Sequence, residues 1–182
     1  RNAGLTVADA TDLRRRMRAA GATYRVAKNR LTTLALAGTR FDGIAPMLTF
    51  GRALCDRDWD TARECFAPDL VLVDHRPLSL GALDREQWID SLRASDDLSI
   101  GLTWDLFRVL AWSEQGIVVG IRRLGTIADG GGPFENELFT TALVVAGRIQ
   151  RYDVFGEADA ERAVARFGEL CAQQAGAARD PA

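Results

Sequence analysis

The chain has 182 residues, 47% of them hydrophobic and 26% charged, a composition typical of a folded globular protein and not of a disordered one. No apolar run reaches the roughly 20 residues of a transmembrane helix, so we expect no membrane partner. A single histidine, and three cysteines without metal-ligand spacing, argue against zinc and non-haem iron sites; we expect neither metal nor cofactor. The first residues lack the apolar stretch of a signal peptide, which favours a cytoplasmic location.

The formal net charge of −2 hides a division along the chain. Residues 1–45 hold nine Lys and Arg against three Asp, a net charge of +6, whereas residues 46–182 carry a net charge of −8. Such asymmetry indicates two parts with different partners. We therefore predict a chimeric chain with a basic segment over 1–45, a domain over 46–175 and a disordered tail over 176–182.

The basic segment is predicted to form helix, strand and helix. Apolar residues recur at helical spacing behind Thr6, which is suited to cap a helix that ends at Gly21. Residues 22–27 partly alternate and include β-branched side chains, which predicts a strand. A second helix over 29–37 would end at Gly38.

Several stretches of this segment, GLTVA at 4–8, RVAKNRL at 25–31 and ALAGT at 35–39, are distinctive. They resemble the bacterial ribosomal stalk-base protein (ribosomal protein L-ten). The resemblance implies an N-terminal domain that docks on ribosomal RNA of the large subunit, and it would place Arg25, Lys28, Asn29 and Arg30 near that RNA. It also implies a helix and a strand before Gly4 and further strands after Ile44.

The acidic part is predicted to begin with helices and to continue with strands. Helical spacing indicates helices over 47–56, 58–66 and 84–95, with Cys55 and Cys65 on buried stripes. Asp84 is suited to cap the last of these helices. A short β-rich run covers 70–75. Strands over 102–112, 116–124, 134–145 and 148–155 would form an antiparallel meander, followed by a helix over 158–175. This order predicts an α+β layered fold.

Motifs such as RDWD at 57–60, FAPDL at 66–70 and VDHRP at 73–77 occur in the same order. With them, residues 47–170 resemble the nuclear-transport-factor-two-like (NTF2-like) superfamily, and within it the SnoaL-like group. The resemblance implies a cone-shaped, curved antiparallel sheet packed on helices, with an apolar pocket at its open end. Members of this superfamily include isomerases, cyclases and hydrolases as well as proteins that only bind or dimerise.

A proton-transfer reaction in such a pocket needs a carboxylate base and a hydrogen-bond donor for the developing oxyanion. The candidate catalytic residues are Asp74, His75, Tyr152 and Asp153. Neighbours in a strand face opposite sides, so only one member of each adjacent pair can enter a pocket. His75 with Asp153 and Asp74 with Tyr152 are both admissible, and structural roles are the alternative for each residue.

The apolar pocket would be lined by Trp104, Leu106, Trp112 and Phe139. Arg108, Arg122 and Arg123 would bind an anionic ligand or pair with acids on the outer sheet face, and we expect pairing. Three functions are consistent with these features. The domain binds a small apolar or amphipathic molecule, with or without catalysis; it is a non-catalytic dimerisation or sensory module; or residues 1–45 bind ribosomal RNA as part of a ribosomal protein. A homodimer is expected.

Overall fold

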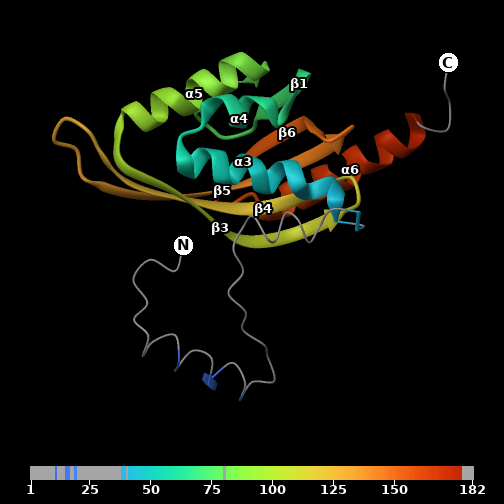
Figure 1. Ribbon diagram of the computed structural model, residues 1–182, viewed down its shortest axis with the longest axis horizontal. Helices are drawn as coiled ribbons and strands as arrows, with labels where there is room; N and C mark the ends of the chain where they lie inside the picture. The colour runs from blue at the N-terminus through green and yellow to red at the C-terminus, as the bar shows by residue number, and fades with distance from the viewer. Residues whose placement is uncertain are drawn as a thin grey trace. The chain divides into compact units, whose positions relative to one another are not determined.

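A computed structural model of the chain describes residues 41–79 and 81–177, residues 38 and 39, and four isolated positions nearer the N-terminus (Figure 1). The chain divides into two compact units at residues 32 and 33, and all the elements named below belong to the second unit. The four residues expected to face RNA, Arg25, Lys28, Asn29 and Arg30, lie outside the described residues. Among the helices of the described ranges, none has both the length and the apolar character needed to cross a membrane.

Helices precede the main sheet and one helix follows it, as predicted. The elements are η1 (Asp42–Ile44), α3 (Ala45–Asp56), α4 (Trp59–Glu64), β1 (Phe66–Asp74), β2 (Ala82–Leu83), α5 (Arg85–Asp97), β3 (Ser99–Ser113), β4 (Gly116–Ile127), β5 (Pro133–Val145), β6 (Arg148–Gly156) and α6 (Ala160–Ala177). The strands form one six-stranded sheet in the order β2-β1-β6-β5-β4-β3. The predicted α+β fold, a curved sheet packed on helices, is confirmed.

Local sequence signals explain where two helices begin. Asp58 caps α4 by accepting the backbone N–H of Thr61. Asp84 caps α5 in a capping box, in which the Asp84 side chain accepts the Gln87 N–H and the Gln87 side chain accepts the Asp84 N–H. The Asp84 cap was expected from the sequence.

The meander of β3 to β6 is antiparallel throughout, as predicted. Ala146 and Gly147 join β5 to β6 with φ values of 49° and 75°, the left-handed conformation that a tight two-residue hairpin requires. The sheet is nevertheless mixed, because β1 pairs with β6 in parallel and sets Leu72 opposite Tyr152. The expectation of a wholly antiparallel sheet was wrong at this one pairing.

Three local predictions also differ from the structure. The helix predicted over 58–66 ends at Glu64, because Phe66 begins β1 and pairs with Ile149. Pro68 then falls in the irregular part of the β1–β6 ladder, where a missing N–H is tolerated. Cys65 is buried as expected, but Cys55 is exposed. Helix α6 continues to Ala177, two residues past the predicted end.

The sheet is covered on both faces by different helices. We call the face that packs against α3 and α5 the α5 face; its buried residues include Phe50, Leu72, Ile89, Tyr152 and Val154. We call the other the α6 face; its buried residues include Val118, Phe139, Phe155, Phe167 and Leu170. In Figure 1 α3, α4 and α5 lie together over one side of the sheet. Strand alternation sends neighbouring residues to opposite faces.

Candidate functional site

A small cavity lies between α3, α5 and the α5 face of the sheet, with a volume of about 50 Å³. Its wall combines aromatic and aliphatic side chains with two arginines and several hydroxyl groups: Phe50, Leu54, Arg76, Trp88, Ser91, Leu92, Ser95, Trp104, Ile121, Arg123, Leu138, Thr140, Tyr152 and Val154. A cavity with apolar walls and a few convergent polar groups is the usual form of a small-molecule site.

Tyr152 lies deep in this wall and is 1% exposed. Its ring makes edge contacts with Phe50 and Phe66, with centroids 6.1 Å and 5.7 Å away. Burial raises the pKa of Tyr152 to about 12, and an interaction with the Thr140 hydroxyl opposes that rise. The phenol therefore keeps its proton at neutral pH and acts as a donor.

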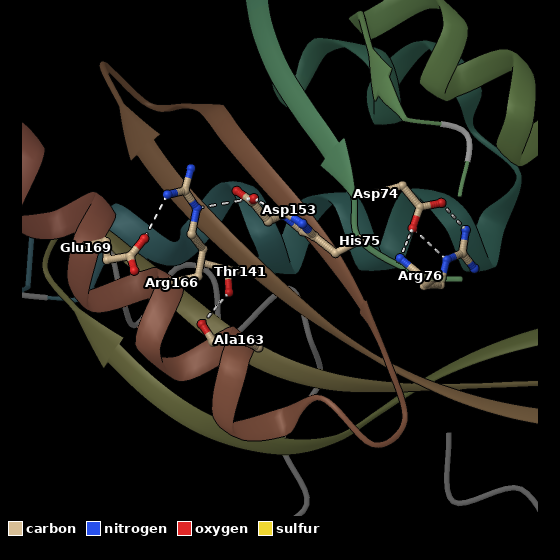
Figure 2. A network of polar contacts seen from close by, with 8 residues as sticks. All are labelled: Asp74, His75, Arg76, Thr141, Asp153, Ala163, Arg166 and Glu169. Carbon is tan, nitrogen blue, oxygen red and sulfur yellow. Dashed lines mark hydrogen bonds and ion pairs between the residues drawn. The ribbon is translucent and has the colours of Figure 1, made fainter. Parts of the chain in front are cut away.

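Arg76 reaches the cavity from the end of β1, with its charge compensated by Asp74. The Asp74 carboxylate, which is 3% exposed, accepts from Arg76 Nε at 2.9 Å and from Arg76 Nη2 at 2.8 Å. These bonds raise the pKa of Arg76. This bidentate pairing holds the Asp74 carboxylate on Arg76 (Figure 2).

Arg123 lines the same cavity without an acidic partner among the described residues. Its guanidinium lies over the Trp104 ring, 4.7 Å from the centroid, and Nη2 donates to the Ser95 hydroxyl. Burial lowers the pKa of Arg123, and the nearby Arg76 lowers it further. On the opposite face Arg122 pairs with Glu135 at 3.1 Å and Glu137 at 2.8 Å. The expectation of acid pairing is thus right for Arg122 and wrong for Arg123.

Three buried polar atoms of this wall lack a hydrogen bond of good geometry within the described part of the chain: Trp88 Nε1, Arg123 Nε and Thr140 Oγ1, the last of which still lies close enough to the Tyr152 phenol to lower its pKa. An unpaired buried polar group costs about 1–3 kcal/mol, and native proteins leave few of them. Three such atoms around one cavity therefore indicate a site that a polar molecule completes.

The second polar cluster lies on the α6 face (Figure 2). His75 Nε2 is 2.6 Å from Asp153 Oδ1, and Arg166 Nε from α6 is 3.4 Å from the same oxygen. Arg166 Nη1 also contacts Glu169 at 2.9 Å. The His75 ring stacks on Phe155, with centroids 4.5 Å apart. Asp153 is 1% exposed, and its Oδ1 is shared by His75 and Arg166.

The four candidate catalytic residues are divided between these places. Asp74 and Tyr152 belong to the α5 face. His75 and Asp153 meet on the α6 face, which is one of the two pairings that strand alternation allowed. The four therefore do not form one site, and a catalytic role for any of them stays a prediction. Within the described ranges no group of three His, Cys, Asp or Glu side chains is arranged to hold a metal.

The residues expected to line the pocket are also separated. Trp104 lines the cavity, but Leu106 and Trp112 are 44% and 43% exposed. Phe139 is buried on the α6 face, near Phe107. The ladder between β3 and β4 shifts register twice between Leu106 and Ala111, so residues 104–112 do not keep one face.

Arg123, Trp88 and Thr140 were not selected from the sequence as site residues. The signal that could have found Arg123 is the alternation of β4. Every second residue of β4 belongs to the core on the α5 face: Ile117, Val119 and Ile121. The next residue of this series is Arg123, a charged side chain at a position where an apolar one is expected. No comparable signal marks Trp88 or Thr140, whose side chains resemble ordinary core residues.

Comparison with known proteins separates two parts of the chain. The family model of Ribosomal protein L10 matches residues 1–55. The large ribosomal subunit protein uL10 of Gluconacetobacter diazotrophicus is 74% identical over 54 residues, which is 30% of this chain and 30% of that protein. The chain thus spans about three tenths of the length of the curated relatives that it matches. The match ends inside α3, whose Met47 and Phe50 are buried in the core of the second unit.

Solved structures similar to the chain align with about two thirds of it. An NTF2-like protein from Burkholderia pseudomallei aligns with a TM-score of 0.52 and 15% identity, over 67% of this chain and 96% of that one. The second unit has the NTF2-like fold. IdmH of Streptomyces antibioticus, named as a candidate polyketide cyclase, aligns with a TM-score of 0.54 and 19% identity, over 69% of this chain and 98% of its own. At these identities the likeness of the NTF2-like domain shows the fold alone.

Proposed function

We propose that the NTF2-like domain binds a small amphipathic molecule in the cavity on the α5 face. The observation that carries the proposal is the set of three unpaired polar atoms in an otherwise apolar, aromatic wall. Apolar parts of a ligand would contact Phe50, Trp88 and Trp104, and its polar atoms would satisfy the unpaired groups.

The cavity favours binding over proton-transfer catalysis. No carboxylate or imidazole is among the residues that line it within the described ranges, and the nearest acid, Asp74, is held by Arg76. Tyr152 keeps its proton at neutral pH, as any phenol with a pKa of about 10 does, and burial raises its pKa further. A general base within hydrogen-bond reach of the ligand is what proton abstraction needs, and this wall does not offer one. His75 and Asp153 lie on the other side of the sheet.

The size of the cavity limits the ligand. A volume of about 50 Å³ has room for about one or two water molecules and is well below the roughly 300–1,000 Å³ of sites for drug-sized ligands. Without rearrangement the domain would therefore accept only a compact fragment of a few heavy atoms, since a cavity that holds a benzene ring measures about 150 Å³. A larger molecule would have to displace α5 from the sheet.

Binding can be tested by nuclear magnetic resonance with ethanol, isopropanol, phenol and benzoate as probes, which range from small enough for the cavity to larger than it. Of the four tryptophans, Trp88 and Trp104 line the cavity, so their indole N–H signals should shift while those of Trp59 and Trp112 stay in place. Ser91→Phe, on the cavity wall, should abolish the shifts. Ala94→Phe, on the exposed side of the same helix, should leave them unchanged. Probes that leave both cavity tryptophans unmoved would contradict the proposal and favour a dimerisation module.

The match over residues 1–55 supports a second candidate function for the other part of the chain. We propose that residues 1–45 associate with RNA of the large ribosomal subunit. Their net charge of +6 suits phosphate contacts, which supply most of the affinity of nonspecific RNA binding. The proposal concerns a segment that is only a part of the related ribosomal proteins.

Filter binding to ribosomal RNA at several salt concentrations tests this second function. Affinity should fall steeply with salt, and the triple variant Arg25→Gln, Lys28→Gln, Arg30→Gln should weaken binding and flatten the salt dependence. The matched control replaces three exposed arginines of the NTF2-like domain, Arg93, Arg108 and Arg148, by Gln. Equal affinity of the two triple variants would exclude a specific role for residues 25–30.

A further inference from the structure

Arginines at adjacent positions of β4 have opposite electrostatic surroundings. Arg122, on the α6 face, contacts two glutamates. Arg123, on the α5 face, donates to the Ser95 hydroxyl, lies over the Trp104 ring and has another cation, Arg76, nearby; in the described structure it contacts no acid, and its Nε is buried without a partner. A buried cation is normally paired with an anion, because its desolvation is otherwise uncompensated.

The residues around Arg123 provide further hydrogen-bond donors, and no carboxylate among the described lining residues is there to pair with it. Arg76 also lines the cavity, but Asp74 already engages its Nε and Nη2. Trp88, which is 8% exposed, has an unpaired indole N–H in the same wall. An indole N–H can only donate, so its natural partner is an oxygen acceptor. Thr140, 1% exposed and unpaired, offers a hydroxyl that donates or accepts.

We propose that the cavity on the α5 face binds small organic acids, with the ligand carboxylate on Arg123 and Trp88 and its apolar body against Phe50 and Leu138. This inference rests on the proposed binding function and specifies the ligand class for the same site. A carboxylate supplies the missing counter-charge to Arg123 and accepts from more than one donor at once. The planar guanidinium, already stacked on Trp104, is oriented for such contacts.

The test compares acids with neutral molecules of the same shape. Acetate and benzoate are titrated into the full-length chain beside acetamide and benzamide, and the Trp88 indole N–H signal is followed. Each acid should bind at least about tenfold more tightly than its amide, since hydrogen bonds to charged groups are about twice as strong as neutral ones. Both pairs are used because the cavity is close in size to the smaller probe.

Matched variants assign the preference to one side chain. Arg123→Gln should lose the preference for acid over amide, and Arg123→Lys should retain part of it because the positive charge remains. Arg122→Gln removes the same charge from the opposite face and should bind both acids like the unaltered protein. Dispersion of the amide signals establishes for each variant that the fold is retained.

The possible results separate this inference from the binding function on which it rests. If the amides bind as tightly as the acids, or if Arg123→Gln keeps the preference, the site binds small molecules but the acid assignment is wrong. If none of the four probes, nor the neutral alcohols, moves the Trp88 signal, the binding function itself is wrong. Preferential acid binding that is lost only in the Arg123 variants supports both.

Discussion

The two faces of the sheet differ in whether their polar side chains have partners inside the protein. On the α6 face, Asp153 meets His75 and Arg166, Thr141 donates to the Ala163 carbonyl, and Arg122 meets two glutamates. On the α5 face, the neighbouring residues in the same strands are Tyr152, Thr140 and Arg123, and the last two have unpaired atoms.

Three adjacent pairs of residues therefore provide an internal control, because strand position is similar within each pair and, in the Tyr152–Asp153 and Thr140–Thr141 pairs, burial is similar as well. Where polar atoms are paired inside the protein, their arrangement is explained by stability. Where they are left unpaired around a cavity, stability does not explain them, and the proposed ligand binding would. The contact between His75 and Asp153 resembles a catalytic dyad, but its atoms are paired inside the protein, so a structural role explains it. A structural role does not explain the unpaired atoms in the cavity wall.

The largest effect on stability is expected from Asp153. Asp153→Ala removes a carboxylate that is 1% exposed and leaves His75 and Arg166 without it, so we expect a loss of about 3 kcal/mol in the free energy of unfolding. Urea denaturation measures the change. Asp56→Ala, which removes an exposed pair with Arg52, serves as control and should cost well under about 1 kcal/mol. Equal losses in the two variants would remove the contrast between the faces.

The next largest effect is a dependence of the free energy of unfolding on pH, caused by Tyr152. In the unfolded chain the phenol ionises at a pKa of about 10, whereas the folded protein retains the proton until the pKa of about 12. The folded state then binds more protons between these values, so its stability is complete below pH 10 and falls as pH rises, by about 1.4 kcal/mol per pH unit.

Comparison with Tyr152→Phe isolates this contribution. Burial raises the pKa of Cys65 to about 11 as well, so the unaltered protein loses stability at high pH from both groups. The difference in slope between the protein and Tyr152→Phe, from urea denaturation between pH 9 and pH 11, reports Tyr152 alone. Identical slopes would show that the phenol is accessible to solvent and that the cavity is open.

The threonine pair should respond to the same substitution with opposite signs. Thr141→Val loses the 2.9 Å hydrogen bond to the Ala163 carbonyl and should destabilise the protein by about 1 kcal/mol. Thr140→Val replaces an unpaired buried hydroxyl by a methyl group of the same shape and should leave the ligand-free protein unchanged or stabilise it by up to about 1 kcal/mol. Thermal unfolding of the two variants side by side decides this. Destabilisation by Thr140→Val as large as that by Thr141→Val would mean that the bond to Tyr152 is strong and the wall is satisfied.

The sequence predicted the fold well and the site only in part. Helical spacing, the Asp84 cap and the turn at residues 146 and 147 are local signals, and the structure confirms them. Alternation correctly allowed His75 to meet Asp153, because parity in a strand is preserved where the ladder is regular. Of the pocket residues expected in β3, only Trp104 lines the cavity, because two register shifts between Leu106 and Ala111 break the alternation of faces beyond it.

What could not be predicted depends on contacts between elements that are distant in the chain. The parallel pairing of β1 with β6 decides that Arg76 and Tyr152 share one face, and no local pattern encodes that pairing. The pairing of arginines with acids is equally non-local. Arg122 finds Glu137 because β4 and β5 set them directly opposite, whereas Asn136 is opposite Arg123. Arg122 and Arg123 are adjacent, yet the register of β4 and β5 pairs only Arg122 with an acid and leaves Arg123 for the proposed ligand.

The smallest expected effect follows from that register. Arg122→Gln breaks contacts with Glu135 and Glu137 at the protein surface and should lower the melting temperature slightly, less so at high salt, because exposed ion pairs are screened. Arg123→Gln breaks no ion pair in the described structure. It loses the hydrogen bond to Ser95 and the contact with Trp104 but relieves repulsion from Arg76, so the ligand-free protein should show only a small change in melting temperature, the same at any salt concentration. A salt-dependent loss in Arg123→Gln would instead reveal an acidic partner for Arg123 in the native protein. In that case the α5 face would be paired like the α6 face, and its cavity would have no charge left to offer a ligand.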